Sequence, residues 1–512
     1  MTELRIHGRN WHRGLRTASA WGRTRHPDTG LATLIVGAGS AARTLVRDLR
    51  DCPDYGLRPA GLLDDDPGIR SACGIPVLGP LADLPRVVRE RHMDAVVIAI
   101  PSLSPAALSG LIRAAADTGA YVRYLPSFLS AMEREARAAD MRTVSFSELL
   151  GRPERRVLEP SVQAVLNGAR VLVTGAGGSI GQELCRQIGS HAPAALHMLD
   201  HDESNMHTLQ LELYGKALLD SSEIIIADIR DAARIQQVFR SVRPDVVFHA
   251  AAHKHLPLLE RHPCEGVKSN VLGTENVVRA ALASSTARMV LISTDKAAEP
   301  RSILGATKRT AEMIVQANAG GPTRVCSVRF GNVLGSRGSL LSVVAQQIEH
   351  GEAVTVTDPE VTRFFMTVEE AVGLVLSAAP MAEYGETFVL DMGEPVRIVD
   401  LVRRYARHLR VPDVTIRFTG LRPGEKLHER LFSEYEERLP TVSPAIWATR
   451  PQRLPDDFAA TLDKLYGAAA DGNDSLVRTL LASIVPDYHP APLDPDEHDE
   501  DVPADSPYPD EF

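Results

Sequence analysis

An acidic and an amine side chain stand next to each other at Asp295 and Lys296, directly after the apolar run RMVLIST at 288–294. A carboxyl group and an amine so placed could give and take protons in one reaction. Lysine is scarce in this chain: only seven of the 56 Lys and Arg residues are Lys. An amine whose pKa can fall does proton chemistry that a guanidinium cannot. Taken alone, however, an Asp-Lys pair after a strand is more commonly solvated surface.

A glycine-rich turn supplies the second group of residues with a chemical use. In the segment TGAGGSIG, Gly175, Gly178 and Gly181 have the TGxxGxxG spacing between an apolar run and an amphipathic stretch. Glycines at such a turn allow positive φ and let backbone N–H groups approach a pyrophosphate at a helix N-terminus. The turn, which also contains Ser179 and Ile180, therefore predicts a dinucleotide site.

Two carboxylates follow this turn, each at the end of a predicted strand. Asp200 lies 19 residues after Gly181. A carboxylate there accepts a hydrogen bond from the ribose 2′-hydroxyl and repels a 2′-phosphate, so NAD is favoured over NADP. Asp228, followed by Ile229, ends the next strand and is positioned to meet the adenine ring. The alternative for Asp228 is a helix cap before Ala232.

Strands that alternate with helices must position these residues, and the sequence predicts two such units. The first opens with a strand, a turn and a helix over 31–50, and its further elements are at 59–66, 94–100, 105–118 and 121–126. The second opens in the same way over 168–190, and its further elements are at 195–200, 223–229, 244–251, 263–284, 288–294 and 324–330. This order predicts an α/β protein with two tandem Rossmann-type doubly wound parallel sheets, the second with a small C-terminal substrate-binding part.

The first unit has a glycine turn of its own. Gly37, Gly39 and Ala42 form GxGxxA between a strand and a helix, and Asp64 to Asp66 end the following strand. This geometry would accept a dinucleotide, but no catalytic group accompanies it. We expect a structural or assembly role for this unit, with regulatory nucleotide binding as the alternative.

The predicted domain order is a flexible Arg-rich arm at 1–30, a Rossmann-like domain at 31–150, a linker at 151–168, a catalytic domain at 169–485 and an acidic Pro-rich tail at 486–512. The tail has ten Asp and Glu and no Lys or Arg, so it accounts for the net charge of −10. Such a composition predicts disorder. The remaining chain is close to neutral, which argues against nucleic-acid binding.

The cysteines and the apolar runs indicate the cellular compartment of the protein. The five cysteines include no CxxC pair, so neither a disulfide framework nor a zinc site is predicted. We find no run of the roughly 20 apolar residues that a membrane helix needs, and no apolar core of a signal peptide. The sequence therefore predicts a cytoplasmic protein with reduced thiols, without a metal and without a membrane span.

Several motifs occur in order along the second unit: TGAGGSIG, HAAAHKHLPLLE, NVLGTENV, STDKAAEP, GATKR, RFGNVLGSRGS and GLRPGEKLHE. They resemble the extended short-chain dehydrogenase/reductase family and, more narrowly, its capsular-polysaccharide and flagellin-glycan branch of nucleotide-sugar 4,6-dehydratases. The resemblance runs from about Ser161 to Phe432. The 31–150 domain resembles the N-terminal domain of the long members of that branch, which carry membrane helices ahead of it. We expect a soluble variant of the long form.

This resemblance implies an NAD-dependent hydro-lyase that converts UDP-N-acetylglucosamine to a UDP-4-keto-6-deoxy-N-acetylhexosamine. Hydride leaves C4, a base removes the C5 proton, an acid protonates the departing 6-hydroxyl, and hydride returns to C6. The resemblance implies Asp295 as the acid and Lys296 as the base. A lysine acts as a base near neutral pH only if its pKa falls, and we expect a closed site and the nearby cation of Lys308 to lower it.

Lys308 matches the lysine of the family's YxxxK element, which holds the nicotinamide ribose. The tyrosine's place four residues earlier is taken by Leu304, and a leucine can neither donate nor accept a proton. Thr294, with Asp295 or an ordered water, would then take the proton of the 4-hydroxyl. The departure leaves open an inactive or repurposed site.

The remaining predicted residues concern the sugar nucleotide. The run His253-Lys254-His255 has no acidic or Cys partner at ligand spacing, so a metal is not expected, and the resemblance places this loop at the sugar and nicotinamide. Asn270 is expected to order the backbone between strands. Guanidinium and ammonium groups suit a nucleoside diphosphate. The predicted substrate-binding residues are Lys254, Asn332, Arg337, Arg363, Arg422, Glu425 and Lys426.

Two other functions stay open. A nucleotide-sugar C4 epimerase would move hydride at C4 and would have no use for Asp295 and Lys296. A catalytically inactive nucleotide-sugar-binding regulator would fit the loss of the tyrosine. We also expect a homo-oligomer: segments 263–284 and 305–318 could pack a dimer as in relatives, although they are equally ordinary as core helices.

Overall fold

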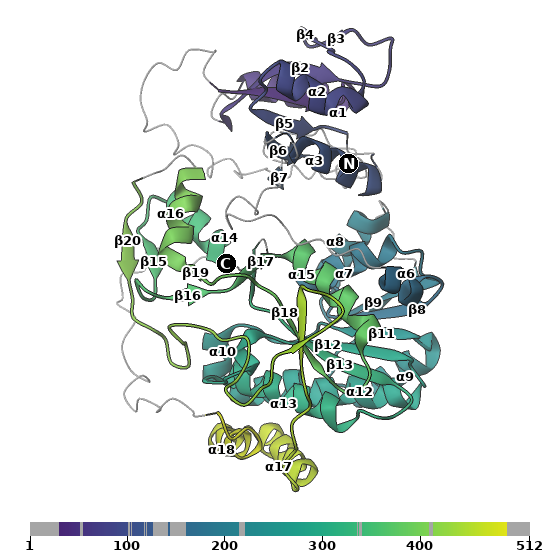
Figure 1. Ribbon diagram of the computed structural model, residues 1–512, viewed down its shortest axis with the longest axis vertical. Helices are drawn as coiled ribbons and strands as arrows, with labels where there is room; N and C mark the ends of the chain where they lie inside the picture. Colours follow the sequence, from purple (N-terminus) through teal and green to yellow (C-terminus); the bar gives the residue numbers. More distant parts are fainter. Residues whose placement is uncertain are drawn as a thin grey trace, which may run out of the picture. The chain divides into compact units, whose positions relative to one another are not determined.

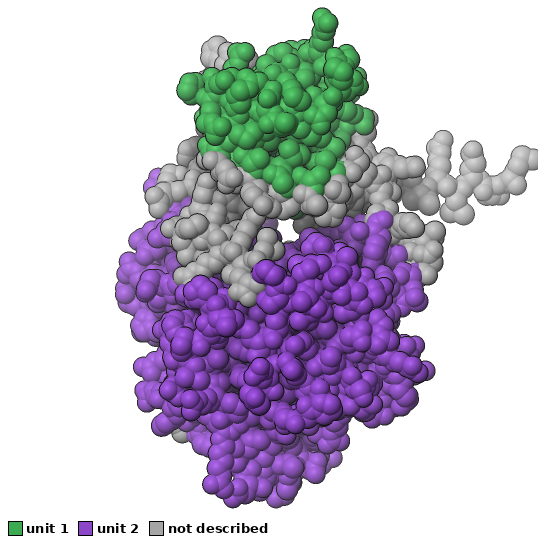
Figure 2. All heavy atoms as spheres, turned by 45° about the vertical axis from the view of Figure 1, so that its right-hand side comes forward, with its two compact units in different colours: residues 1–145 green, residues 146–512 purple. Residues whose placement is uncertain are grey.

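The computed structural model describes residues 30–51, 55–100, 103, 105–116, 118, 120–125, 142–143, 160–214, 221–334, 336, 340–408 and 413–488. The predicted arm before residue 30, the tail beyond residue 488, the first half of the predicted linker (151–159), and Arg337 lie outside these residues. The chain divides into two compact units, Met1–Ser145 and Phe146–Phe512 (Figure 2).

The first unit is built on a sheet with the strand order β2-β1-β5-β6-β7. All neighbouring strands pair in parallel except β7, which is antiparallel to β6. Ile35 packs with α1 on one face of the sheet, whereas Leu34 and Val36 pack with α2 and α3 on the other. The elements are β1 Leu31–Val36, α1 Ser40–Asp51, β2 Leu57–Leu63, β3 Ser71–Ala72, β4 Ile75–Pro76, η3 Leu81–Asp83, α2 Leu84–Glu90, β5 Ala95–Ile98, α3 Pro105–Ala116, β6 Tyr121–Tyr124 and β7 Arg142–Thr143.

The second unit contains a larger sheet with the strand order β10-β9-β8-β11-β12-β13-β18-β22-β21. The strands run parallel from β10 to β18, and β22 and β21 add an antiparallel edge. Both sheets confirm the predicted pair of Rossmann-type units. The strands are β8 Arg170–Thr174, β9 Ala195–Asp200, β10 Ile224–Ile226, β11 Val246–His249, β12 Arg288–Ile292, β13 Arg324–Arg329, β18 Thr387–Leu390, β21 Leu439–Pro440 and β22 Ile446–Thr449.

Helices cover both faces of this sheet (Figure 1). Alternate residues of a strand point to opposite faces, so Leu172 packs with α9, α12 and α13, while Val171 and Val173 pack with α6, α7, α8 and α15. The helices are α6 Pro160–Leu166, α7 Ser179–Gly189, α8 Glu203–Tyr214, α9 Ala232–Val242, α10 Leu256–Arg261, α13 Ile303–Ala317 and α15 Val368–Ala378. The short turns η6 and η7 span Asp295–Ala297 and Ala379–Met381. Helix α6 lies within the stretch predicted as a linker.

The segment predicted as one helix over 263–284 is interrupted. Helix α11 spans Pro263–Gly266, a π-helical stretch η5 spans Val267–Leu272, and α12 continues over Gly273–Ala283. π-helical turns are rare and often lie at functional sites. Here the stretch contains the buried Asn270, whose side chain bonds the backbone of His253. The sequence periodicity alone did not predict this widened turn.

A smaller layer of paired strands and helices follows β13, as predicted for the substrate-binding part. Strand β14 Asn332–Leu334 pairs with β17 Phe365–Thr367, β15 Val354–Val356 with β20 Ile416–Phe418, and β16 Thr362–Arg363 with β19 Val396–Arg397. Helices α14 Leu340–Glu349 and α16 Ile398–His408 share a separate apolar core with these strands.

Two C-terminal helices, α17 Phe458–Ala470 and α18 Asp474–Ile484, pack against α11, η5 and α13 (Figure 1, yellow). Leu465 and Leu481 are fully buried there. The contact is reinforced where Arg478 pairs with Glu260 at 2.9 Å. The segments considered for a dimer thus lie inside the second unit's own core. Among the described helices, none has the length and apolar character needed to cross a membrane.

Candidate active site

In the glycine turn after β8, backbone segments lie too close together to leave space for side chains. Gly175 has φ +70°, and a Cβ there would lie 2.5 Å from the backbone nitrogen of Ala251. A Cβ on Gly181 would overlap the carbonyl oxygen of Gly175. Gly178 is the N-cap of α7, so Ser179 and Ile180 form the first turn of that helix. The turn therefore has the form that lets a pyrophosphate reach a helix N-terminus.

Asp200, at the end of β9, holds this turn in place. Its Oδ2 accepts a hydrogen bond of 2.9 Å from the backbone N–H of Gly177, and its Oδ1 accepts one from Asp202. The side chain is buried except for a small exposed fraction. A carboxylate at the end of this strand would repel a 2′-phosphate.

Asp228 does not cap a helix, so the helix-cap alternative is wrong. The N-cap of α9 is Asp231, whose side chain accepts from the backbone N–H of Arg234. Asp228 instead binds the guanidinium of Arg230 at 2.7 Å. Burial alone would raise the pKa of Asp228, but its hydrogen bonds with Arg230 outweigh burial and lower it. The neighbouring Ile229 is buried against Gly273, where a Cβ would lie 2.5 Å from the Ile229 Cδ1.

Asp295 is buried beyond the carboxyl end of β12, and Lys296 beside it is partly buried. Oδ1 of Asp295 accepts hydrogen bonds from Thr294 Oγ1 at 3.0 Å and from Lys296 Nζ at 3.0 Å. Oδ2 has no hydrogen-bond partner among the residues that the structure describes, although the side chain is fully buried. Burial raises the pKa of Asp295, against the effect of Lys296. A carboxyl that resists ionisation beside an amine is suited to proton transfer.

Lys296 lies between two carboxylates. Its Nζ is 3.0 Å from Asp295 Oδ1 and 3.6 Å from Glu429 Oε1, and it donates to Asn332 Oδ1 at 3.4 Å. Burial favours a lower pKa, but Asp295 and Glu429 outweigh it, so the pKa of Lys296 is raised. The expectation that Lys308 lowers this pKa is therefore wrong for the chain without ligand. Glu429 was not predicted as a site residue, although it ends the motif GLRPGEKLHE.

Lys308 is buried on α13 and donates to the carbonyl oxygen of Ile292. Burial lowers the pKa of Lys308 to about 8. Leu304, one helical turn earlier, is buried and adds no polar group. The neighbouring Thr307 accepts a hydrogen bond from Asn270 Nδ2 at 3.1 Å. Asn270 thus joins the loop after β11 to α13, in keeping with the backbone-ordering role expected for it.

The predicted substrate residues divide into two groups. Asn332, Arg363, Glu425 and Lys426 lie in one network, in which Arg363 pairs with Glu425 at 2.7 Å and Lys426 pairs with Glu429 at 2.8 Å. Arg422 is exposed, and its backbone N–H donates to Glu425. Lys254 lies in the exposed loop after β11.

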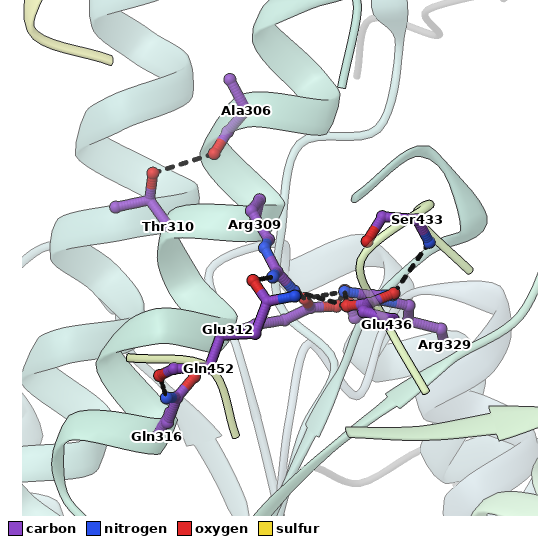
Figure 3. Close-up of polar contacts among 10 residues, drawn as sticks. Ala306, Arg309, Thr310, Glu312, Gln316, Arg329, Ser433, Glu436 and Gln452 are labelled. Atoms are coloured by element: carbon purple, nitrogen blue, oxygen red, sulfur yellow. Dashed lines mark hydrogen bonds and ion pairs between the residues drawn. The ribbon is translucent and has the colours of Figure 1, made fainter. Parts of the chain in front are cut away.

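Arg309, Glu312, Arg329 and Glu436 form a network of charged side chains (Figure 3). The guanidinium of Arg329 at the end of β13 forms two hydrogen bonds with Glu312 of α13 and two with Glu436. Arg309 pairs with both glutamates at 3.0 Å. Ser293, two residues before Asp295, donates to Glu312 at 2.6 Å. The network therefore ties the ends of β12 and β13 to the segment that follows Glu429.

The fold and the site define a protein with two Rossmann-type units, the second of which has a dinucleotide-type turn and a buried acid–amine pair. Residues 171–451 match the family described as polysaccharide biosynthesis protein, and the chain belongs to that family. Residues 11–126 match a family described as CoA-binding domain.

Individual relatives agree with this assignment. The probable polysaccharide biosynthesis protein EpsC of Bacillus subtilis is 42% identical over 423 residues, which are 81% of this chain and 70% of the relative. A UDP-glucose 4-epimerase of Rickettsia akari is 34% identical over 271 residues, 51% of this chain and 77% of the relative. The solved structure of Pen from Bacillus thuringiensis has 32% identity and a TM-score of 0.51, covering 56% of this chain and 88% of that chain.

Proposed function

We propose that this chain is an NAD-dependent sugar-nucleotide 4,6-dehydratase of polysaccharide biosynthesis, with UDP-N-acetylglucosamine as substrate. The observation that carries the proposal is the direct hydrogen bond between Asp295 and Lys296 at the carboxyl end of β12, where open α/β sheets bind ligands. Elimination of water needs an acid for the departing hydroxyl and a base for the C5 proton. This buried pair could supply both.

The glycine turn and Asp200 would hold NAD, and Lys308 would contact its nicotinamide ribose. The positive φ of Gly175 and the crowding at Gly181 support a pyrophosphate site, and the Asp200 carboxylate favours a free 2′-hydroxyl. When bound, NAD⁺ accepts the C4 hydride and later returns it to C6.

The side chains can balance the protons of this reaction. Transfer of one proton from Lys296 Nζ to Asp295 Oδ1, along their 3.0 Å hydrogen bond, gives a neutral amine and a carboxylic acid. Lys296 then takes the C5 proton while Asp295 gives its proton to the 6-hydroxyl, the C6–O bond breaks and water leaves. Lys296 returns a proton to C5 when hydride reaches C6. The 4-hydroxyl proton leaves to solvent through Thr294 when hydride leaves C4. After hydride has returned, one proton taken up from solvent restores the Lys296 ammonium and so replaces the proton lost in water.

Mass spectrometry of the full chain incubated with UDP-N-acetylglucosamine tests the proposal. We expect loss of one water from the sugar nucleotide and, in deuterated water, one deuterium at C5 of the product. Binding without turnover would support the regulator instead, and a dehydrated product without label at C5 would exclude Lys296 as an exchanging base.

A C4 epimerase is the second candidate, favoured by the 34% identity to the Rickettsia akari UDP-glucose 4-epimerase. An epimerase would return a product of unchanged mass with inverted configuration at C4. The same incubation, followed by chromatography against both epimers, separates the two activities.

A further inference from the structure

Glu429 is a buried carboxylate that the proposed reaction does not use. Its side chain is 3% exposed, and its two oxygens face different cations: Oε1 lies 3.6 Å from Lys296 Nζ, and Oε2 lies 2.8 Å from Lys426 Nζ. Buried carboxylates are costly unless they are paired. Because the pairing includes the amine of the proposed base, Glu429 is placed to act on that base.

The charged groups around Lys296 come from two elements, η6 and β16, and from the loop that contains Glu429. Asp295 lies on η6 beside Lys296 itself. The positive charge of Arg363 on β16 disfavours the ammonium form of Lys296. Arg363 is in turn held by Glu425. In the loop, Lys426 competes for Glu429 and also donates to the carbonyl oxygen of Glu299 at 2.8 Å.

On the basis of the proposed function, we propose that Glu429 is a positioning residue that holds the Lys296 ammonium against Asp295 and sets how readily Lys296 releases its proton. The anionic carboxylate favours the ammonium and so opposes the transfer to Asp295. The ammonium of Lys426 pairs with the same carboxylate and weakens its attraction for Lys296. Lys426 therefore favours release of the Lys296 proton. Two neighbouring substitutions should therefore move the titration of one amine in opposite directions, which a purely structural role would not do.

The titration of Lys296 can be measured without turnover. The full chain is labelled briefly with acetic anhydride at a series of pH values, and acetylation of each lysine is quantified by mass spectrometry, which the small number of lysines makes tractable. The reagent acetylates the neutral amine, and one pKa unit corresponds to about a tenfold change in amine fraction at a fixed pH below the pKa. Lys464, in α17, serves as an internal control.

In Glu429→Gln we expect Lys296 to be acetylated about tenfold faster at a fixed pH, with its midpoint at lower pH. In Lys426→Met we expect the midpoint to rise, and in Glu429→Asp, which keeps the charge, we expect it to stay near that of the unaltered chain. Equal midpoints in Glu429→Gln and the unaltered chain, or shifts of the same sign in Glu429→Gln and Lys426→Met, would overturn the proposal. Should Glu429→Gln fail to fold, the sign of the Lys426→Met shift decides.

The test of the proposed function is independent of the test of Glu429. If the unaltered chain does not dehydrate the sugar nucleotide, the dehydratase proposal fails, while the acetylation midpoints still report on Glu429. If it does, the basic limb of the pH–rate profile should shift with the same sign as the acetylation midpoint in each variant.

Discussion

Two lysines of the candidate site, Lys296 and Lys308, have opposite electrostatic surroundings. Carboxylates on both sides raise the pKa of Lys296, whereas burial lowers the pKa of Lys308 to about 8 because Glu312 only partly offsets it. Lys296 thus needs a proton acceptor before it can act as a base. Asp295, whose own pKa is raised, is in direct contact to provide one.

Substituting each lysine should separate their roles. Lys296→Ala should lower the rate of dehydration by roughly 10²–10⁴, the usual contribution of a general base, and leave NAD affinity unchanged. Lys308→Ala should weaken NAD retention. Turnover measured by mass spectrometry and bound NAD measured after gel filtration test both, and equal losses in the two variants would contradict the assigned roles.

At the scale of elements, the charge network of Arg329, Glu312, Glu436 and Arg309 joins β13, α13 and the segment after Glu429. Glu312→Gln leaves Arg329 buried with one partner fewer, so we expect a loss of about 3–5 kcal/mol in unfolding free energy. The exposed pair of Arg453 and Asp456 is a matched control, and Asp456→Asn should cost less than about 1 kcal/mol. Denaturant unfolding of both variants measures the difference.

The same network predicts an acid dependence. Although burial opposes it, Arg329 lowers the pKa of Glu312 to about 2 in the folded chain. A carboxyl with a depressed folded pKa stabilises the fold above its unfolded pKa of about 4.3 and loses that contribution as pH falls towards 2. We expect the melting temperature to fall over this interval, and by less in Glu312→Gln. Parallel pH profiles of the two proteins would refute this origin.

Helix α7 offers two glycines with different surroundings. Gly181→Ala would place a Cβ on the Gly175 carbonyl oxygen, whereas nothing lies within 4 Å of a Cβ at Gly189. We expect Gly181→Ala to abolish NAD binding and Gly189→Ala to leave it intact, as measured by titration calorimetry. Normal binding by Gly181→Ala would show that this turn does not hold the dinucleotide.

Local patterns predicted most elements, because a strand buried on both faces, such as the one containing Val171, Leu172 and Val173, is a continuous apolar run in the sequence. Asp295 and Lys296 could be found because they directly follow a strand. Glu429 could not be assigned in the same way, because its contact with Lys296 depends on how a distant loop folds back. The raised pKa of Lys296 was missed for the same reason.

At the scale of the whole molecule, the two Rossmann-type units share a contact that holds the glycine turn but differ in their catalytic side chains. In the first, the backbone N–H of Ala38 donates to Asp64 Oδ2 at 2.6 Å, much as Gly177 donates to Asp200 in the second. The residues described in the first unit include no counterpart of the acid–amine pair.

We expect the full chain, freed of nucleotide, to bind one NAD per chain, and Gly181→Ala to bind none. Equilibrium dialysis with NAD and, separately, with coenzyme A measures the stoichiometry. A second NAD, or saturable binding of coenzyme A, would assign a ligand to the first unit and overturn its structural interpretation.

The packing of α17 and α18 on α11 and α13 has a consequence for synthesis on the ribosome. Domains fold as their chains emerge, N-terminal parts first. Part of the apolar surface of α13, η5 and α11 packs against α17 and α18, whose buried Leu465 and Leu481 are translated after those elements. A nascent chain stalled before α17 would therefore expose this apolar surface to solvent. We expect chaperones to bind such a chain until α17 and α18 have been translated.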